Sequence, residues 1–130
     1  LNRTAIYFNG IGQCNIKVNE YSFKICVTHK TPLNSRFNAT HGLKQMARQI
    51  IPDADLYLAG DTHVPAFEIA YERGRWQTFM KLGTMKTDDG YTKRYFNFYT
   101  SKENPCFVID TETKEIIPFK NLNQAINYAK

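Results

Sequence analysis

The chain has 130 residues, of which 42% are hydrophobic and 22% charged, and its formal net charge is +5. This length suits one domain with a sizeable core, and no apolar run approaches the roughly 20 residues that cross a bilayer. We therefore expect residues 1–130 to form a single globular domain with no membrane partner. The positive charge favours anionic partners such as nucleic acid, a nucleotide or a phosphoprotein.

The cysteines exclude two further classes of protein. Cys14, Cys26 and Cys106 are odd in number and show no Cys-x-x-Cys spacing, so the sequence signals neither a zinc knuckle nor a disulfide framework. Cys26 and Cys106 lie within apolar runs and are expected to pack as small hydrophobic side chains. A reducing, cytoplasmic location is the simplest expectation.

The first third of the chain predicts strands that lead to a histidine. A strand is expected over 5–8, followed by a hairpin whose strands are 16–18 and 21–27. Alternation predicts one apolar face for the second hairpin strand, made of Phe23, Ile25 and Val27. His29 follows directly at the end of this strand, and 30–38 reads as a loop beside it.

A central helix is predicted next. Thr40 is a plausible N-cap, and Pro52 ends the pattern. The residues with helical spacing are Leu43, Met46, Ala47 and Ile50. His41, in the first turn, is a candidate substrate contact or an alternative metal ligand to His29. The alternative is an exposed histidine with no special role.

A short buried strand, Leu56–Ala59, then runs into the polar segment 60–65, which we call the elbow. The elbow places Asp61 and His63 two residues apart. Strand ends of an open sheet commonly present ligands in this way, so His29, Asp61 and His63 could meet at one edge. The alternatives are that His29 merely caps a strand and that Asp61 is a turn-forming residue.

The second half of the chain is strand-rich. Strands are expected over 66–71, 76–80, 94–99, 106–110 and 114–119. A turn at Arg73–Arg75 joins the first two, and a short helix is expected over 122–129. The predicted class is therefore α/β, mostly β with one central helix and a short C-terminal helix. The paired Asp88 and Asp89, beside a turn signal at Gly90, are expected to be solvated rather than to bind metal.

Two motifs resemble the C-terminal half of a calcineurin-like metallophosphoesterase. They are Val27-Thr28-His29 and Ala54-Asp55 followed by Gly60-Asp61-Thr62-His63-Val64-Pro65. In that family one strand ends in a metal-binding histidine, and a later strand, after an Ala-Asp pair, ends in Gly-His-x-His. By position, the resemblance implies that His29, Asp61 and His63 are metal ligands. Asp61 departs from the family's histidine, and a carboxylate favours harder ions such as Mn²⁺ or Mg²⁺.

The resemblance implies a dinuclear site that hydrolyses phosphate esters with divalent ions, Mn being favoured and Fe, Zn and Mg the alternatives. It also implies half of a four-layer β-sandwich. The family's Asp-x-His, Gly-Asp-x-x-Asp and Gly-Asn-His motifs do not precede His29, so no catalytic residue is assigned. Since the chain starts at Leu1, without a methionine, we expect an upstream segment to carry those motifs. The chain alone should be nearly inactive.

The substrate is less determined by the sequence. Basic and aromatic residues interleave in the second half of the chain, namely Tyr71, Arg73, Arg75, Trp76, Lys81, Lys86, Tyr91, Lys93, Arg94 and Tyr95. Such a mixture suits nucleic acid, but the favoured interpretation is that the aromatic residues face the core and the lysines cover a solvated surface. The rival hypothesis is a non-catalytic module on a degenerate phosphoesterase fold, which binds nucleic acid or protein. A half-sandwich with an exposed sheet face could also form a homodimer.

Overall fold

The computed structural model of the chain describes residues 3–8, 10–35, 37–60, 62–84 and 104–130, the first of these ranges as backbone alone. The expected strand over 94–99, the Asp88–Asp89 pair and Asp61 lie outside the described residues. The remaining expected strands, the central helix and the terminal helix are confirmed. The described structure is mostly β with two helices, as the predicted class requires.

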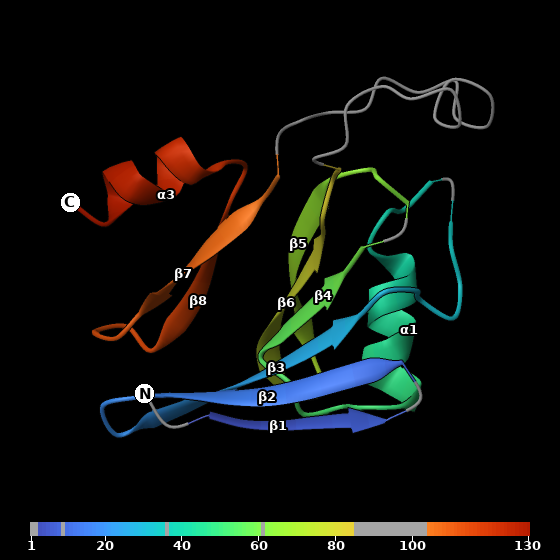
Figure 1. The fold of residues 1–130 in the computed structure, drawn as a ribbon, viewed down its shortest axis with the longest axis horizontal. Coiled ribbons are helices and arrows are strands. Elements are labelled where there is room, and N and C mark those ends of the chain that lie inside the picture. The colour runs from blue at the N-terminus through green and yellow to red at the C-terminus, as the bar shows by residue number, and fades with distance from the viewer. Residues whose placement is uncertain (1–2, 9, 36, 61, 85–103) are drawn as a thin grey trace.

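Most of the strands form one six-stranded sheet in the order β1-β2-β3-β4-β6-β5. Its strands are β1 (Arg3–Phe8), β2 (Ile11–Val18), β3 (Tyr21–Thr28), β4 (Leu56–Ala59), β5 (Ala66–Glu72) and β6 (Arg75–Lys81). The central strands β3, β4 and β6 are parallel to one another, whereas β1–β2, β2–β3 and β5–β6 pair antiparallel. The carboxyl ends of β3, β4 and β6 therefore share one edge of the sheet (Figure 1).

Local turn chemistry explains the β5–β6 hairpin. Glu72 pairs with Arg75, and the two residues between them, Arg73 and Gly74, both have positive φ, 54° and 82°. Two-residue hairpin loops favour positive φ at both positions, because this twist matches that of the strands. The predicted turn is confirmed. The hairpin β2–β3 is longer than expected, since β2 begins at Ile11 rather than at residue 16.

Helix α1 (His41–Gln49) connects β3 to β4 and covers one face of the sheet (Figure 1). Its residues Leu43, Met46 and Ala47 are almost completely buried and belong to one cluster with Tyr57 and Phe79. The rings of Tyr57 and Phe79 stack with their centroids 5.1 Å apart. A helix is the usual connection between parallel strands, and α1 makes that connection between β3 and β4.

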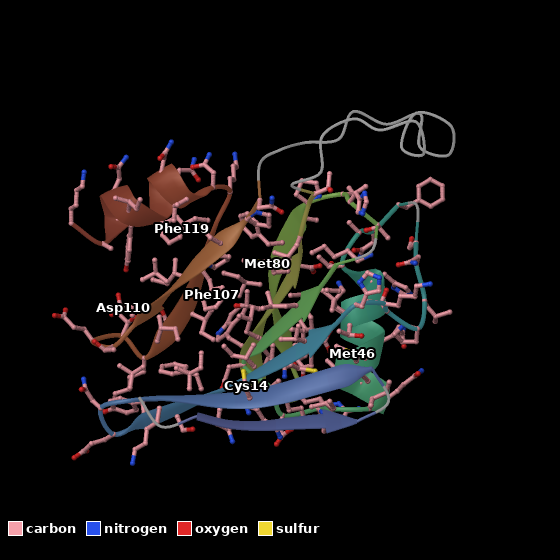
Figure 2. All side chains as sticks on the ribbon, viewed as in Figure 1. Cys14, Met46, Met80, Phe107, Asp110 and Phe119 are labelled. Carbon is pink, nitrogen blue, oxygen red and sulfur yellow. The ribbon has the colours of Figure 1, made fainter. Side chains whose placement is uncertain are left out.

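The opposite face is covered by a second sheet, formed by β7 (Cys106–Asp110) and β8 (Glu115–Phe119). Figure 2 shows Met80 and Phe107 between the two sheets, and Met46 on the helix side. Burial here is incomplete. Phe23 and Ile25 are buried, whereas Val27, which shares their face by strand alternation, is 42% exposed. The second sheet covers the amino-terminal part of β3 and does not extend to Val27.

Helix α3 (Leu122–Tyr128) lies on the outer face of the second sheet. The ring of Tyr128 packs on Phe119, 5.2 Å between centroids, and its hydroxyl donates to Asp110 at 2.8 Å. Phe119 and Asp110 point away from the face of β7–β8 that contacts the six-stranded sheet, because side chains alternate along a strand. The described elements thus stack in the order α1, six-stranded sheet, two-stranded sheet, α3 (Figure 1).

A groove of about 740 Å³ runs between the two sheets, and its walls include Phe23, Asp55, Trp76 and Ile116. It lies toward the amino-terminal ends of the parallel strands, away from the histidines. Within the described residues, no helix is both long and apolar enough to cross a membrane.

Candidate metal-binding site

The parallel pairing of β3 and β4 brings the two histidine-bearing segments to one edge. Thr28, the last residue of β3, is in register with Ala59, the last residue of β4. The next amide continues the pairing, because Gly60 N–H donates to the carbonyl of Thr28 at 3.3 Å. His29 therefore leaves its strand beside the start of the elbow. The carboxyl end of adjacent parallel strands is where open α/β sheets bind ligands.

His29 lies directly against the elbow. A Cβ atom placed on Gly60 would be 3.7 Å from His29 Nδ1, which is ordinary van der Waals contact. His29 is solvent-exposed, and its Nδ1 lies near Gly60 at the start of the elbow. The two motifs on which the family resemblance depends, one ending in His29 and the other containing Gly60, are therefore neighbours in the structure.

His63 adopts an unusual backbone conformation. Its φ is 55°, in the left-handed region, and it is not a glycine. Such a conformation costs about 1–2 kcal/mol and persists where the surrounding structure holds it. Just before it, Thr62 N–H donates to the carbonyl of Gly60 at 3.0 Å, which closes the elbow. His63 is half-buried, in contrast to His29. Strained backbone of this kind is concentrated at functional sites.

The donor set suits a first-row divalent ion. Imidazole nitrogen binds Mn, Fe and Zn ions, and His29 and His63 would each supply one such donor. Asp61, the third predicted ligand, lies outside the described residues. Among the residues that the structure describes, no group of three or more His, Cys, Asp or Glu side chains is positioned to hold a metal. The structure thus places His29 beside the start of the elbow that carries His63.

His41 lies at the same edge, as the first residue of α1. Beside this end of the helix is an open hollow of about 390 Å³ between two segments, 37–40 and 66–68. The segment 66–68 begins β5, directly after the elbow. Thr40 and Glu68 line the hollow, and the Thr40 hydroxyl donates to Glu68 at 2.5 Å. His41 follows Thr40 in the chain and therefore lies beside this hollow.

Lys81 is a site residue that the sequence reasoning missed. The sequence placed it among surface basic residues, but it is only 3% exposed. It ends β6 in register with Ala59, and its ammonium donates to Asn34 Oδ1 at 3.0 Å and to Thr62 Oγ1 at 3.3 Å. Strand alternation could have found it, because Lys81 lies on the same face of β6 as the buried Phe79.

The loop after His29 is fixed by several contacts. Thr28 Oγ1 donates to the carbonyl of Lys30 at 2.7 Å, and Thr31 Oγ1 donates to Asn34 Oδ1 at 2.9 Å. The loop also packs on the first turn of α1. A Cβ atom on Gly42 would lie 2.0 Å from the carbonyl oxygen of Leu33 and 2.5 Å from Thr31 Oγ1. Glycine at position 42 is therefore required for this close approach.

The basic and aromatic residues that the sequence grouped together make different kinds of contact in the structure. Trp76 and Tyr71 are 66% and 61% exposed and form an edge-to-face pair, so these two aromatic residues do not enter the core. Arg75 pairs with the carboxylate of Asp55, and Arg73 donates to the carbonyl of Arg48. The other members of the predicted mixture lie outside the described residues, namely Lys86, Tyr91, Lys93, Arg94 and Tyr95.

The cysteines do not contribute to this site. Cys26 is completely buried in the core beneath α1, and burial raises the pKa of its thiol to about 11. Burial therefore favours the protonated thiol, which packs in the core. Its predicted role as a small hydrophobic side chain is confirmed.

Comparison with known proteins adds no family to this geometry. Neither family models, nor curated protein sequences, nor solved structures give a match to this chain.

Proposed function

We propose that this chain supplies His29 and His63 as ligands of a divalent metal site that hydrolyses phosphate esters. The observation that carries the proposal is the parallel pairing of β3 and β4, which places His29 against Gly60 at the start of the elbow that bears His63. Asp61 belongs to the same proposal by its position in the sequence.

The chain's own residues have limited tasks in this proposal. When bound, the metal supplies Lewis-acid polarisation of a phosphoryl oxygen and an activated water. His29 and His63 bind the ion through neutral imidazole nitrogen, and the carboxylate of Asp61 favours Mn²⁺, with Fe, Zn and Mg ions as alternatives. His41 contacts the ester where the hollow meets α1. No proton transfer is assigned to this chain.

Two further features support the proposal. The order of layers, helix, sheet, sheet, helix, is compatible with part of a metallophosphoesterase-type sandwich. The net charge of +5 favours an anionic substrate, either a phosphomonoester or a phosphodiester. Under this proposal the chain alone binds metal weakly and turns over little substrate.

Calorimetric titration with Mn²⁺ tests the proposal directly. We expect saturable binding to the unmodified chain and at least about tenfold weaker binding to His63→Ala, since each tenfold step corresponds to about 1.4 kcal/mol of lost ligation. The matched control is His41→Ala, which should bind Mn²⁺ as the unmodified chain does but bind inorganic phosphate more weakly when Mn²⁺ is present. Equal Mn²⁺ affinity of His63→Ala and the unmodified chain, or no saturable binding at all, would refute the assignment.

The second candidate is a non-catalytic binding module, and the exposed Trp76 and Tyr71 favour it. Exposed aromatic faces stack on bases and also anchor protein partners, including a second copy of the chain. Trp76 is the only tryptophan, so its fluorescence reports on this surface without labelling. Quenching by a single-stranded oligonucleotide, together with absent Mn²⁺ binding, would favour the module. Light scattering at micromolar concentration would show whether the predicted homodimer forms.

A further inference from the structure

We propose that Lys81 is a positioning residue, whose ammonium holds the loop after His29 and the elbow before His63 at a fixed separation. The inference deepens the proposed function and rests on it only where metal affinity is concerned. It makes β6 the third strand of the site, beside β3 and β4.

The burial of Lys81 is the first argument. Lysine is almost never fully buried, because removing an ammonium from water is costly unless hydrogen bonds replace the lost hydration. Lys81 is nevertheless 3% exposed, whereas Lys24 and Arg75 of the same sheet form ion pairs at the surface. A buried ammonium that keeps its charge must be surrounded by acceptors in a defined geometry, so it resists movement of those acceptors.

The identity of its acceptors is the second argument. Asn34 lies five residues after His29, and Thr62 directly precedes His63. The Lys81 ammonium donates to both, at 3.0 Å and 3.3 Å, so one buried group connects the two segments. Asn34 Oδ1 also accepts from the Thr31 hydroxyl, which extends the connection back toward His29.

The position of Lys81 in the sheet is the third argument. Its backbone is in register with Ala59, and Leu82 N–H donates to the carbonyl of Ala59 at 2.9 Å. The lysine stem is therefore anchored in a central strand, and only its head reaches toward the loops. A strand that supports two loops through one buried side chain is an arrangement that positions ligands accurately.

Hydrogen exchange on the metal-free chain tests the inference without relying on metal. In Lys81→Met, which keeps the length of the side chain but removes the donors, we expect exchange of segments 30–35 and 62–65 to accelerate by about tenfold. Lys81→Arg should restore most of the protection. The matched control is Lys24→Met, at the opposite end of the sheet, which should leave both segments unchanged.

Mn²⁺ titration of the same variants supplies the second readout. We expect Lys81→Met to bind about tenfold more weakly than the unmodified chain and Lys81→Arg to recover. Should the unmodified chain bind no Mn²⁺, the proposed function fails, while exchange still decides the role of Lys81. Should Lys81→Met not fold, Thr62→Val and Asn34→Ala each remove one acceptor and should each loosen both segments. Exchange within about twofold of the unmodified chain in these variants overturns the inference.

Discussion

The two ends of the parallel strands carry polar residues in different arrangements. At the amino-terminal end, Asp55 accepts from the backbone N–H of Lys24 at 2.7 Å through one carboxylate oxygen and from Arg75 through the other. Its own N–H donates to the carbonyl of Lys24 at 2.8 Å. Gln77 donates to the carbonyl of Ala54 at 2.8 Å. These contacts connect neighbouring strands directly to one another.

At the carboxyl end, the candidate ligands are carried by loops rather than by strands. His29 begins one loop, and His63 lies in the other with a left-handed backbone. Two polar side chains at this end belong to strands, namely Thr28, which donates to the carbonyl of Lys30, and Lys81, which reaches both loops. One end of the sheet therefore fixes the register of the strands, and the other presents side chains outward to a possible ligand.

This comparison also clarifies the resemblance to metallophosphoesterases. The Ala-Asp pair that precedes the elbow belongs to the motif. In the structure, however, Asp55 lies at the amino-terminal end of β4, whereas His63 lies beyond its carboxyl end. Its carboxylate accepts from Lys24 of β3 and from Arg75 of β6, so it connects the two strands on either side of β4. An aspartate at this point of the motif is explained by strand pairing, so the metal-binding inference depends on the elbow and on His29 alone.

The largest loss of stability is expected from disturbing the packing at the carboxyl end of the parallel strands, where the histidines lie. Gly42→Ala would place a Cβ atom 2.0 Å from the carbonyl oxygen of Leu33, so either α1 or the loop after His29 must shift. We expect a loss of about 2–4 kcal/mol in the free energy of unfolding, at or above the upper end of the usual range for overpacking. Chemical denaturation measures it.

Gly60→Ala is the matched control for that substitution. Its Cβ atom would meet His29 Nδ1 at 3.7 Å, which is an acceptable contact, so the expected loss is under about 1 kcal/mol. Equal stabilities of the two variants would show that the close approach at Gly42 is not maintained in solution.

A smaller effect is expected at the amino-terminal end. Asp55→Ala leaves the Lys24 N–H and the Arg75 guanidinium without their carboxylate, and we expect a loss of about 1–3 kcal/mol. Mn²⁺ affinity should not change, because this end is remote from the histidines. Asp53→Ala is the control, since its ion pair with Lys24 is exposed and should contribute less than about 1 kcal/mol. A weakened Mn²⁺ affinity in Asp55→Ala would contradict the separation of the two ends.

The smallest effect concerns the ion pair at the hollow. Burial raises the pKa of Glu68, but the Thr40 hydroxyl and the Lys44 ammonium, 2.9 Å away, outweigh it and hold this pKa below its ordinary value of 4.5. Because the folded pKa is the lower one, the stabilisation is present above pH 4.5 and is lost as the pH falls through the folded pKa.

Thermal unfolding between about pH 7 and pH 3 measures this contribution, which should stay below about 1 kcal/mol because the pair is partly solvated. Glu68→Gln should lack this part of the acid dependence, whereas other carboxylates keep theirs. An unchanged acid profile in Glu68→Gln would show that the ion pair does not stabilise the fold.

Much of the local structure could be predicted from the sequence. Alternating apolar residues defined the strands, the turn at Arg73–Gly74 was recognisable from its residue types, and Pro52 limited the central helix. These signals depend on near neighbours in the chain, whose periodicity and turn chemistry act locally. The candidate ligands His29 and His63 were predicted from local signals too, since His29 directly follows β3 and His63 lies in the elbow after β4.

Long-range pairing decided the rest. No local pattern specifies that β4 lies between β3 and β6, yet this order places His29 against Gly60, buries Lys81 and joins Asp55 to both neighbouring strands. It also leaves Trp76 exposed near the edge of the sheet, where sequence reasoning favoured a core position. The sequence by itself determined which residues stand at strand ends, because that is local chemistry. Only the tertiary structure decided which ends meet, because strand order depends on contacts between residues far apart in the chain.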